Sequence, residues 1–160
     1  AAQEFRPLAE AGDAKSQFNL GVMYENGHGV AQDNAAAIKW YRRAAKAGHA
    51  EAQYNLGVMY DNGQGVPQNY AEAMSWYRRA AETGHAKAHN NLGILYSNGK
   101  GVPQDYIPAH MWANLAASNS NDLSTGLRAI IASEMSPAEI ERAQARAAQC
   151  LASNYQDCGG

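Results

Sequence analysis

Few residues of this chain have the types and spacings that catalysis requires. Ser97 and Lys100 show the Ser-x-x-Lys spacing in which a lysine can activate a serine nucleophile for acyl transfer. The Ser-Asp-Asn and Lys-Thr-Gly motifs that accompany this spacing in such enzymes do not occur in the sequence. We therefore give the pair almost no weight as a catalytic site.

The five histidines do not have the spacing of a metal site either, because no His-Glu-x-x-His motif occurs. His85 and His89 are four residues apart and could share a helical face. His85 repeats His49 at the start of an expected helix, however, and this favours a local capping role over metal binding. The sequence also lacks a phosphate loop and a nucleotide fingerprint, so we expect no enzyme, no metal and no cofactor.

The two cysteines, Cys150 and Cys158, both lie near the end of the chain. An unbroken helix would separate them by about 12 Å, so a disulfide requires the helix to end between them. Ser153-Asn154 permits such an end. Two interpretations are open: a disulfide, which favours a periplasmic or secreted protein, or two free thiols, which leave a cytoplasmic location open.

Composition excludes some classes of partner. The 160 residues carry a net charge of −2, whereas a general nucleic-acid binder is expected to be basic. No apolar run approaches the roughly 20 residues that cross a bilayer, so we expect no membrane insertion. The chain begins at Ala1 without a methionine, inside what reads as the second helix of a hairpin, and we expect it to be a trimmed or processed product.

A 36-residue repeat contains the candidate side chains of residues 12–119 and must position them. The string Leu-Gly-Val-Met-Tyr occurs at 20–24 and again at 56–60, and Leu92, Gly93 and Tyr96 continue its frame. Self-similarity at this period is typical of stacked repeats, in which each unit buries its apolar face against its neighbours. The sequence therefore predicts an all-α solenoid, and we expect these segments: 1–11, a partial second helix; 12–47, 48–83 and 84–119, three repeats; 120–160, a helical cap and tail.

Each repeat reads as two helices joined by a glycine-rich turn. Glycine recurs inside the first helix at Gly21, Gly57 and Gly93, at about 1 kcal/mol of helix propensity each, and this suggests close approach by a neighbouring helix. The second helix has an apolar stripe that includes a tryptophan in every repeat, and we expect all three to be buried. After 119 the period decays, and the Ser-Pro-Ala-Glu segment at 136–139 predicts a new helix with a capping box.

The repeated residues resemble the Sel-one-like repeat, a relative of the tetratricopeptide repeat. The positions that carry this resemblance are Ala14, Leu20-Gly21, Tyr24, Gly27, Gly29-Val30, Ala37, Trp40-Tyr41, Ala44-Ala45 and Gly48, with their copies in the next two units. The resemblance implies a right-handed superhelix that works as a binding or adaptor module, often in bacterial envelope or signalling complexes. Ala113 departs from the pattern, because the other repeats have Tyr41 and Tyr77 there, so the third repeat is expected to pack differently against the cap.

In tetratricopeptide repeats, one face of the first helices lines a concave groove, and the resemblance assigns partner binding to the matching residues here. These are Lys15, Phe18, Asn19 and Val22; Glu51, Tyr54, Asn55 and Val58; and Lys87, Asn90, Asn91 and Ile94. The asparagine column at 19, 55 and 91 has two open interpretations, contact with a ligand or hydrogen bonds that hold the stack together. Phe18 and Tyr54 could likewise be aromatic anchors for a partner or packing residues.

The leading functional hypothesis is a noncatalytic adaptor that binds a protein or an extended peptide on this concave face. The alternative is an envelope hydrolase or cell-wall-binding protein with a β-lactamase-like site, and a third interpretation is a fragment of a longer repeat array. On the opposite side, Lys39, Arg42, Arg43 and Lys46 predict a basic face, either solvated or used for electrostatic docking. The sequence does not define the oligomeric state.

Overall fold

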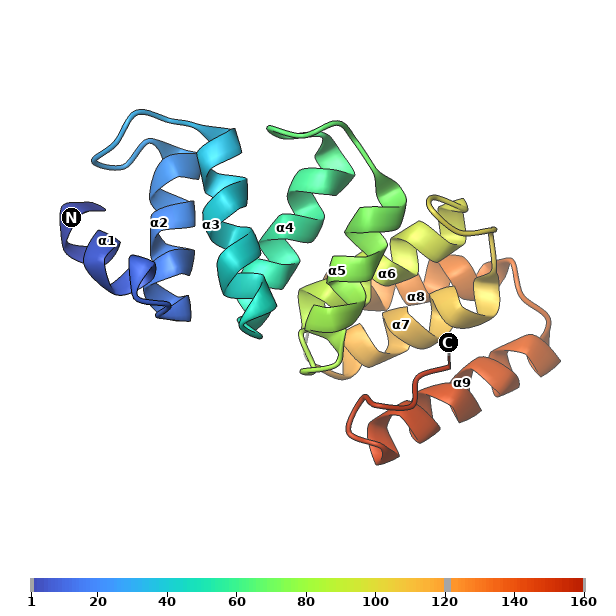
Figure 1. Ribbon diagram of the computed structural model, residues 1–160. Helices are drawn as coiled ribbons and strands as arrows, with labels where there is room; N and C mark the ends of the chain where they lie inside the picture. Colours follow the sequence, from blue (N-terminus) through green and yellow to red (C-terminus); the bar gives the residue numbers. More distant parts are fainter. Residues whose placement is uncertain (1, 120–121, 160) are drawn as a thin grey trace. The chain divides into compact units, whose positions relative to one another are not determined.

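A computed structural model describes residues 2–119 and 122–159, with the side chain of Asp122 excepted, and every regular element in these ranges is an α-helix (Figure 1). The predicted segments 1–11 and 120–160 include residues 1, 120, 121 and 160, which lie outside the described residues. The helices are α1 (Ala2–Glu10), α2 (Ala14–Asn26), α3 (Asn34–Lys46), α4 (Ala50–Asn62), α5 (Tyr70–Ala81), α6 (Ala86–Asn98), α7 (Tyr106–Ser118), α8 (Asp122–Ser133) and α9 (Pro137–Ala152).

The helices repeat at the period of the sequence. The first helices α2, α4 and α6 begin at Ala14, Ala50 and Ala86, each 36 residues after the last, and each is followed by a second helix. The prediction of an all-α fold built from 36-residue helical hairpins is therefore confirmed. Helix α8 begins 36 residues after α6, at 122, so it occupies the position of the first helix of a fourth hairpin.

The chain forms two compact units, residues 1–76 and 77–160, with the boundary inside α5. In the first unit α1 packs on α2, α2 on α3 and α3 on α4. Tyr41 is fully buried in this core with Leu20 and Leu56. A Cβ atom at Gly21 would lie 2.5 Å from the Tyr41 ring, so α3 does approach α2 too closely for a larger residue. Trp40 was expected to be buried but is only half-buried, packed against the core, with the Arg43 guanidinium 4.8 Å from its ring centre.

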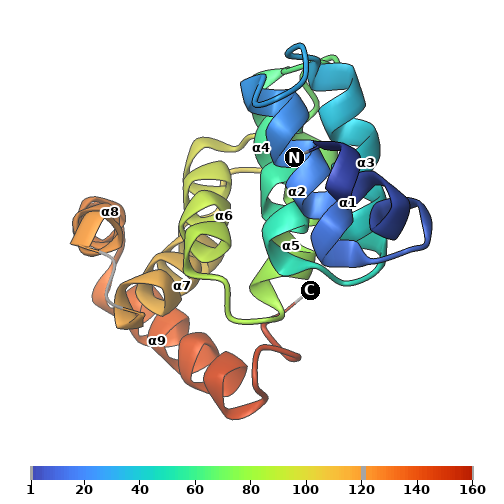
Figure 2. The same cartoon turned by 90° about the vertical axis from the view of Figure 1, so that its left-hand side faces the viewer.

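The second unit is centred on α7, which contacts α6, α8 and α9 (Figure 2). Trp112 is buried here, as predicted. A Cβ atom at Gly93 would meet the Ala109 carbonyl at 3.2 Å and the Leu127 side chain at 3.4 Å, where the first repeat has a tyrosine ring against its glycine. The neighbours of the repeated glycine therefore differ between the first and third repeats, in which Tyr41 and Ala113 stand at equivalent positions, and Leu127 of α8 is one of those in the third.

Side chains tie consecutive hairpins together at one repeated position. Gln17 Nε2 donates to the carbonyl of Ala9 at 2.9 Å, and Gln53 Nε2 donates to the carbonyl of Ala45 at 3.1 Å. In the second unit, His89 Nε2 lies 3.0 Å from the Ala81 carbonyl and takes the same role. Each of these carbonyls also accepts a hydrogen bond from the backbone N–H of the glycine three residues later, so the side chain supplies a second partner at the end of the preceding helix.

A second repeated tie involves arginine and tyrosine. Arg42 donates from the second helix α3 to the hydroxyl of Tyr60 on α4, and Arg78 donates in the same way to the hydroxyl of Tyr96 on α6. The prediction that Arg42 belongs to a solvated or docking face was therefore incomplete, because its guanidinium hydrogen-bonds to the next hairpin.

The helix ends are capped by side chains. His49 Nδ1 and His85 Nδ1 each accept a hydrogen bond from the backbone N–H three residues later, at 3.2 Å, which confirms the predicted capping role of His85. Ser136 and Glu139 form the predicted capping box at the start of α9, and hydrogen bonds to Ser136 lower the pKa of the Glu139 carboxyl.

After α9 the chain turns back on itself, and Cys150 and Cys158 form a disulfide. Asn154 and Tyr155 have left-handed backbone conformations in this turn, so the helix ends between the cysteines as a bridge requires. The segment 153–159, which we call the C-terminal hook, returns to the start of the third repeat, where the Tyr155 ring lies 5.1 Å from the ring of His89.

Candidate functional site

The structure places the residues predicted to contact a partner along α2, α4 and α6. Lys15, Glu51, Lys87 and Ile94 are exposed; Phe18, Asn19, Val22, Tyr54, Asn55, Val58, Asn90 and Asn91 are half-buried. All twelve positions are at least partly accessible, and several of them also make contacts inside the fold.

Two half-buried members of the set pack within the first unit. The ring of Phe18 stacks on His49 with 4.6 Å between the ring centres and lies 5.7 Å from the ring of Tyr41. The side chain of Asn55 hydrogen-bonds to the hydroxyl of Tyr41, which itself donates to Glu25 at 2.5 Å. Burial and the bond to Glu25 raise the pKa of Tyr41. These contacts link α2, α3 and α4 and favour the stack-holding interpretation for Asn55.

The second unit contains a groove of about 440 Å³ between the C-terminal half of α6, the start of α7 and α8. Its walls include the predicted residue Ile94, which is 37% exposed, and Ile130, which is 68% exposed. Ile131 is nearly inaccessible. The full lining is Ile94, Ser97, Asn98, Gln104, Tyr106, Leu127, Ile130, Ile131 and Glu134.

Three contacts fix α8 beside this groove. Ser124 Oγ donates to Asn90 Oδ1 on α6 at 2.9 Å, so Asn90 also serves the stack. Arg128 Nη1 donates to Asn114 Oδ1 on α7 at 2.7 Å. Leu127 packs against the backbone of α6 at Gly93. The groove therefore lies between helices that are held by both polar and apolar contacts.

Sequence reasoning missed the α8 side of the groove because α8 lies outside the three recognised repeats. A signal was nevertheless present, since Ile130 follows Ile94 by 36 residues and is the fourth member of the column Val22, Val58 and Ile94. Leu127 and Ile131 do not follow this column, but with Leu123 and Ile130 they form an apolar stripe at helical spacing, which predicts an apolar helix face and not a groove.

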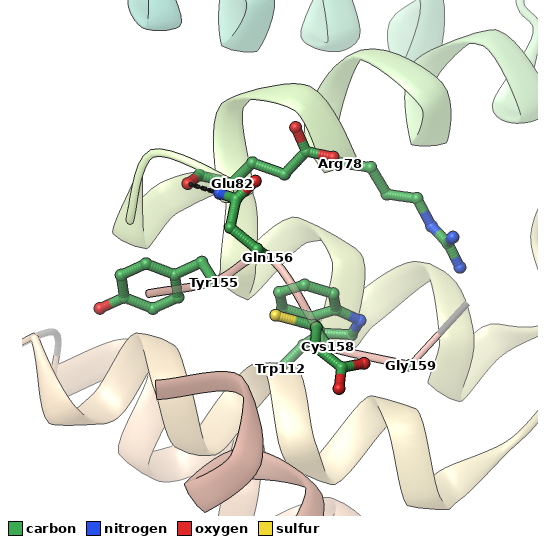
Figure 3. A pocket seen from close by; sticks show the side chains of 8 residues that line it. Arg78, Glu82, Trp112, Tyr155, Gln156, Cys158 and Gly159 are labelled. Carbon is green, nitrogen blue, oxygen red and sulfur yellow. Dashed lines mark hydrogen bonds between the residues drawn. The ribbon is translucent and has the colours of Figure 1, made fainter. Parts of the chain in front are cut away.

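A smaller hollow of about 180 Å³ lies beside the C-terminal hook (Figure 3). Tyr155 and Trp112 line it, and Gln156 Nε2 donates to the carbonyl of Glu82 at 3.3 Å. The hook itself forms one side of this hollow, and the disulfide at Cys158 holds the hook, so the shape of the hollow depends on the disulfide.

The residues that were weak candidates for catalysis or metal binding make contacts that belong to the repeat. Ser97 lines the groove, and its hydroxyl donates to the Ile94 carbonyl of the same helix at 3.0 Å. Within residues 2–119 and 122–159, no group of three or more metal-ligating side chains comes together. Among the described helices, none has the length and apolar character needed to traverse a bilayer.

The hairpins, their 36-residue spacing and the groove on the first helices define an α-helical repeat protein of the class that generally mediates protein–protein interactions. Three consecutive segments, residues 14–49, 50–85 and 86–121, match the family model of the Sel1 repeat, and the chain belongs to this family.

Solved structures agree with this assignment. The chain is similar to a protective antigen present in uropathogenic Escherichia coli strains and displaying an SLR fold, with 41% identity, a TM-score of 0.75, and coverage of 78% of this chain and 27% of the antigen. It is also similar to a Sel1 repeat protein from Oxalobacter formigenes, with 38% identity, a TM-score of 0.67, and coverage of 70% and 45%. The chain thus spans less than half the length of either relative. No curated protein matches it.

Proposed function

We propose that this protein is a noncatalytic module that binds a partner protein or an extended peptide on the surface of its first helices, with the groove between α6 and α8 as the main contact site. The observation that carries this proposal is the combination of a 440 Å³ hollow with Ile94 and Ile130 exposed on its walls. Apolar side chains that remain exposed beside a hollow are typical of interaction sites, because their burial releases water when a partner binds.

The other predicted positions support a wider contact surface. In the first unit, Lys15 and Glu51 are exposed at the starts of α2 and α4, and Val22 and Val58 occupy the column to which Ile94 and Ile130 belong. We propose that these residues of the first unit also contact the partner, while the apolar groove of the second unit supplies most of the affinity. The disulfide supports an oxidising compartment, such as the periplasm or the extracellular space.

Affinity capture followed by a titration tests the proposal. A partner is first captured from the native organism with wild-type protein and purified. The double variant Ile94→Ser, Ile130→Ser should then raise the dissociation constant for this partner at least about tenfold, because each change removes apolar contact area. Leu151→Ser is the matched control, since Leu151 is 46% exposed on α9 and does not line the groove. Unchanged affinity in the double variant would refute the groove as the contact site.

A further inference from the structure

We propose that the groove between α6 and α8 selects an aliphatic segment of a protein partner that carries a lysine or arginine next to its apolar anchor. This inference rests on the proposed function above and adds the chemistry of the partner. It follows from the aliphatic walls of the groove and from the sign of the charge at one end of it.

The apolar part of the groove is aliphatic. Ile94, Leu127, Ile130 and Ile131 supply its walls and floor. The one aromatic ring in the lining, that of Tyr106, has its hydroxyl hydrogen-bonded by Gln104 Nε2 at 3.0 Å. A hollow of about 440 Å³ is large enough for more than one aliphatic side chain. The matching ligand is therefore a pair of neighbouring leucine, isoleucine or valine residues.

The charge at the groove is negative. Glu134 is the one charged side chain among the described residues that line it. Helices α6 and α8 end at Asn98 and Ser133, so the negative ends of two helix dipoles lie at the groove, whereas the start of α7 at Tyr106 contributes one positive end. A cation placed beside Glu134 gains from the carboxylate and from the end of α8.

Two cations of this unit, Arg128 and Lys100, do not line the groove. Arg128 lies on α8, but its guanidinium donates to Asn114 on α7 and does not line the groove. Lys100 follows α6 in the turn and is likewise absent from the lining. A basic residue supplied by the partner is therefore complementary to Glu134, and such complementarity selects between partners more strongly than it raises affinity.

Fluorescence anisotropy with three labelled peptides tests this inference. The basic probe is Ser-Leu-Ile-Lys-Lys-Ser-Gly, the acidic probe has glutamate for both lysines, and the polar probe has serine for leucine and isoleucine. At low salt the basic probe should bind about tenfold more tightly than the acidic one, and high salt should reduce this ratio. Both should bind more tightly than the polar probe.

Charge reversal gives the decisive comparison. Glu134→Lys should reverse the order of the basic and acidic probes, whereas Glu141→Lys, a matched change at an exposed position on α9, should leave it intact. Equal binding of the basic and acidic probes, or an unchanged order in Glu134→Lys, would overturn the charge selection and leave the proposed function standing. If neither apolar probe bound more tightly than the polar probe, the proposed function itself would fail.

Discussion

The position occupied by Gln17, Gln53 and His89 in the three repeats makes the same hydrogen bond with two different residue types. Gln17 and Gln53 donate to a carbonyl eight residues earlier, and His89 does so in the third repeat. His89 is completely buried, and its Nδ1 atom has no hydrogen-bond partner among the described residues. Burial lowers the pKa of His89 and the charge of His85 adds to this effect, while the Ala81 carbonyl opposes it. The folded protein therefore favours the neutral imidazole.

The stability of the second unit should consequently decrease in acid. A histidine in the unfolded chain binds a proton below about pH 6.5, whereas buried His89 resists protonation, so the unfolded state binds more protons and the free energy of unfolding falls as pH decreases from 7 to 5. His89→Gln should remove this loss, because glutamine makes the same bond in the other repeats. Urea unfolding monitored by circular dichroism at several pH values measures the effect, which is at most about 1.4 kcal/mol per pH unit for one proton.

The matched control is His28→Gln, because His28 is exposed in the turn after α2. It should leave the pH dependence unchanged. Burial also lowers the pKa of His110, which lies beside Arg128, so a smaller slope should remain in His89→Gln. A slope equal to that of the wild type in His89→Gln would show that His89 does not cause the acid sensitivity.

At the level of the helix, two glycines in the interiors of different helices should respond in opposite ways to alanine. A Cβ atom at Gly21 in α2 would lie 2.5 Å from the Tyr41 ring, whereas nothing lies within 4 Å of one at Gly126 in α8. Gly126→Ala should therefore stabilise the protein by up to about 1 kcal/mol through helix propensity. Gly21→Ala should destabilise it by about 1–3 kcal/mol, since overpacking displaces α3. Thermal unfolding of both variants checks this pair, and stabilisation by both would contradict the close approach.

The helices and their turns could be predicted because their causes are local and repeated. Each helix is specified by an apolar stripe, turn glycines and capping residues that lie within a few positions of each other. Three copies of this pattern identify the helices and the turns. The packing of α8 could not be predicted in the same way. It involves Leu127 of α8 and Ala113 of α7, which both lie near Gly93 of α6, and no local pattern connects residues on three different helices.

The candidate site was predicted only in part for the same reason. The arc on the first helices identified Ile94, but the other aliphatic wall of the groove comes from α8, where only Ile130 keeps the 36-residue frame. In the asparagine column, the hydrogen bond from Asn55 to Tyr41 favours the stack-holding interpretation at that position, and ligand contact stays a prediction. Asn90, next to the column, hydrogen-bonds to Ser124. Their use in the stack depends on partners distant in sequence, which one sequence does not reveal.

At the scale of the whole molecule, repeat proteins gain stability mainly from contacts between neighbouring elements, so a local change should have a local effect. The disulfide closes a short loop at the end of the second unit, and the hook that it holds contacts His89 and the carbonyl of Glu82. The hook therefore covers the start of the third repeat, and the stability of the second unit should depend on the disulfide.

Replacing Cys150 and Cys158 by serine should destabilise the second unit by about 2–3 kcal/mol, the chain-entropy value for a loop of this length. Hydrogen exchange measured by mass spectrometry should become faster in α9 and in α7, against which α9 packs, and remain unchanged in α1 and α2. Reduction of the wild-type protein should produce the same pattern, which separates loss of the bridge from an effect of serine. An equal loss of protection in α1 and α2 would instead show that the chain unfolds as one cooperative body, because the perturbation would then have passed through every hairpin.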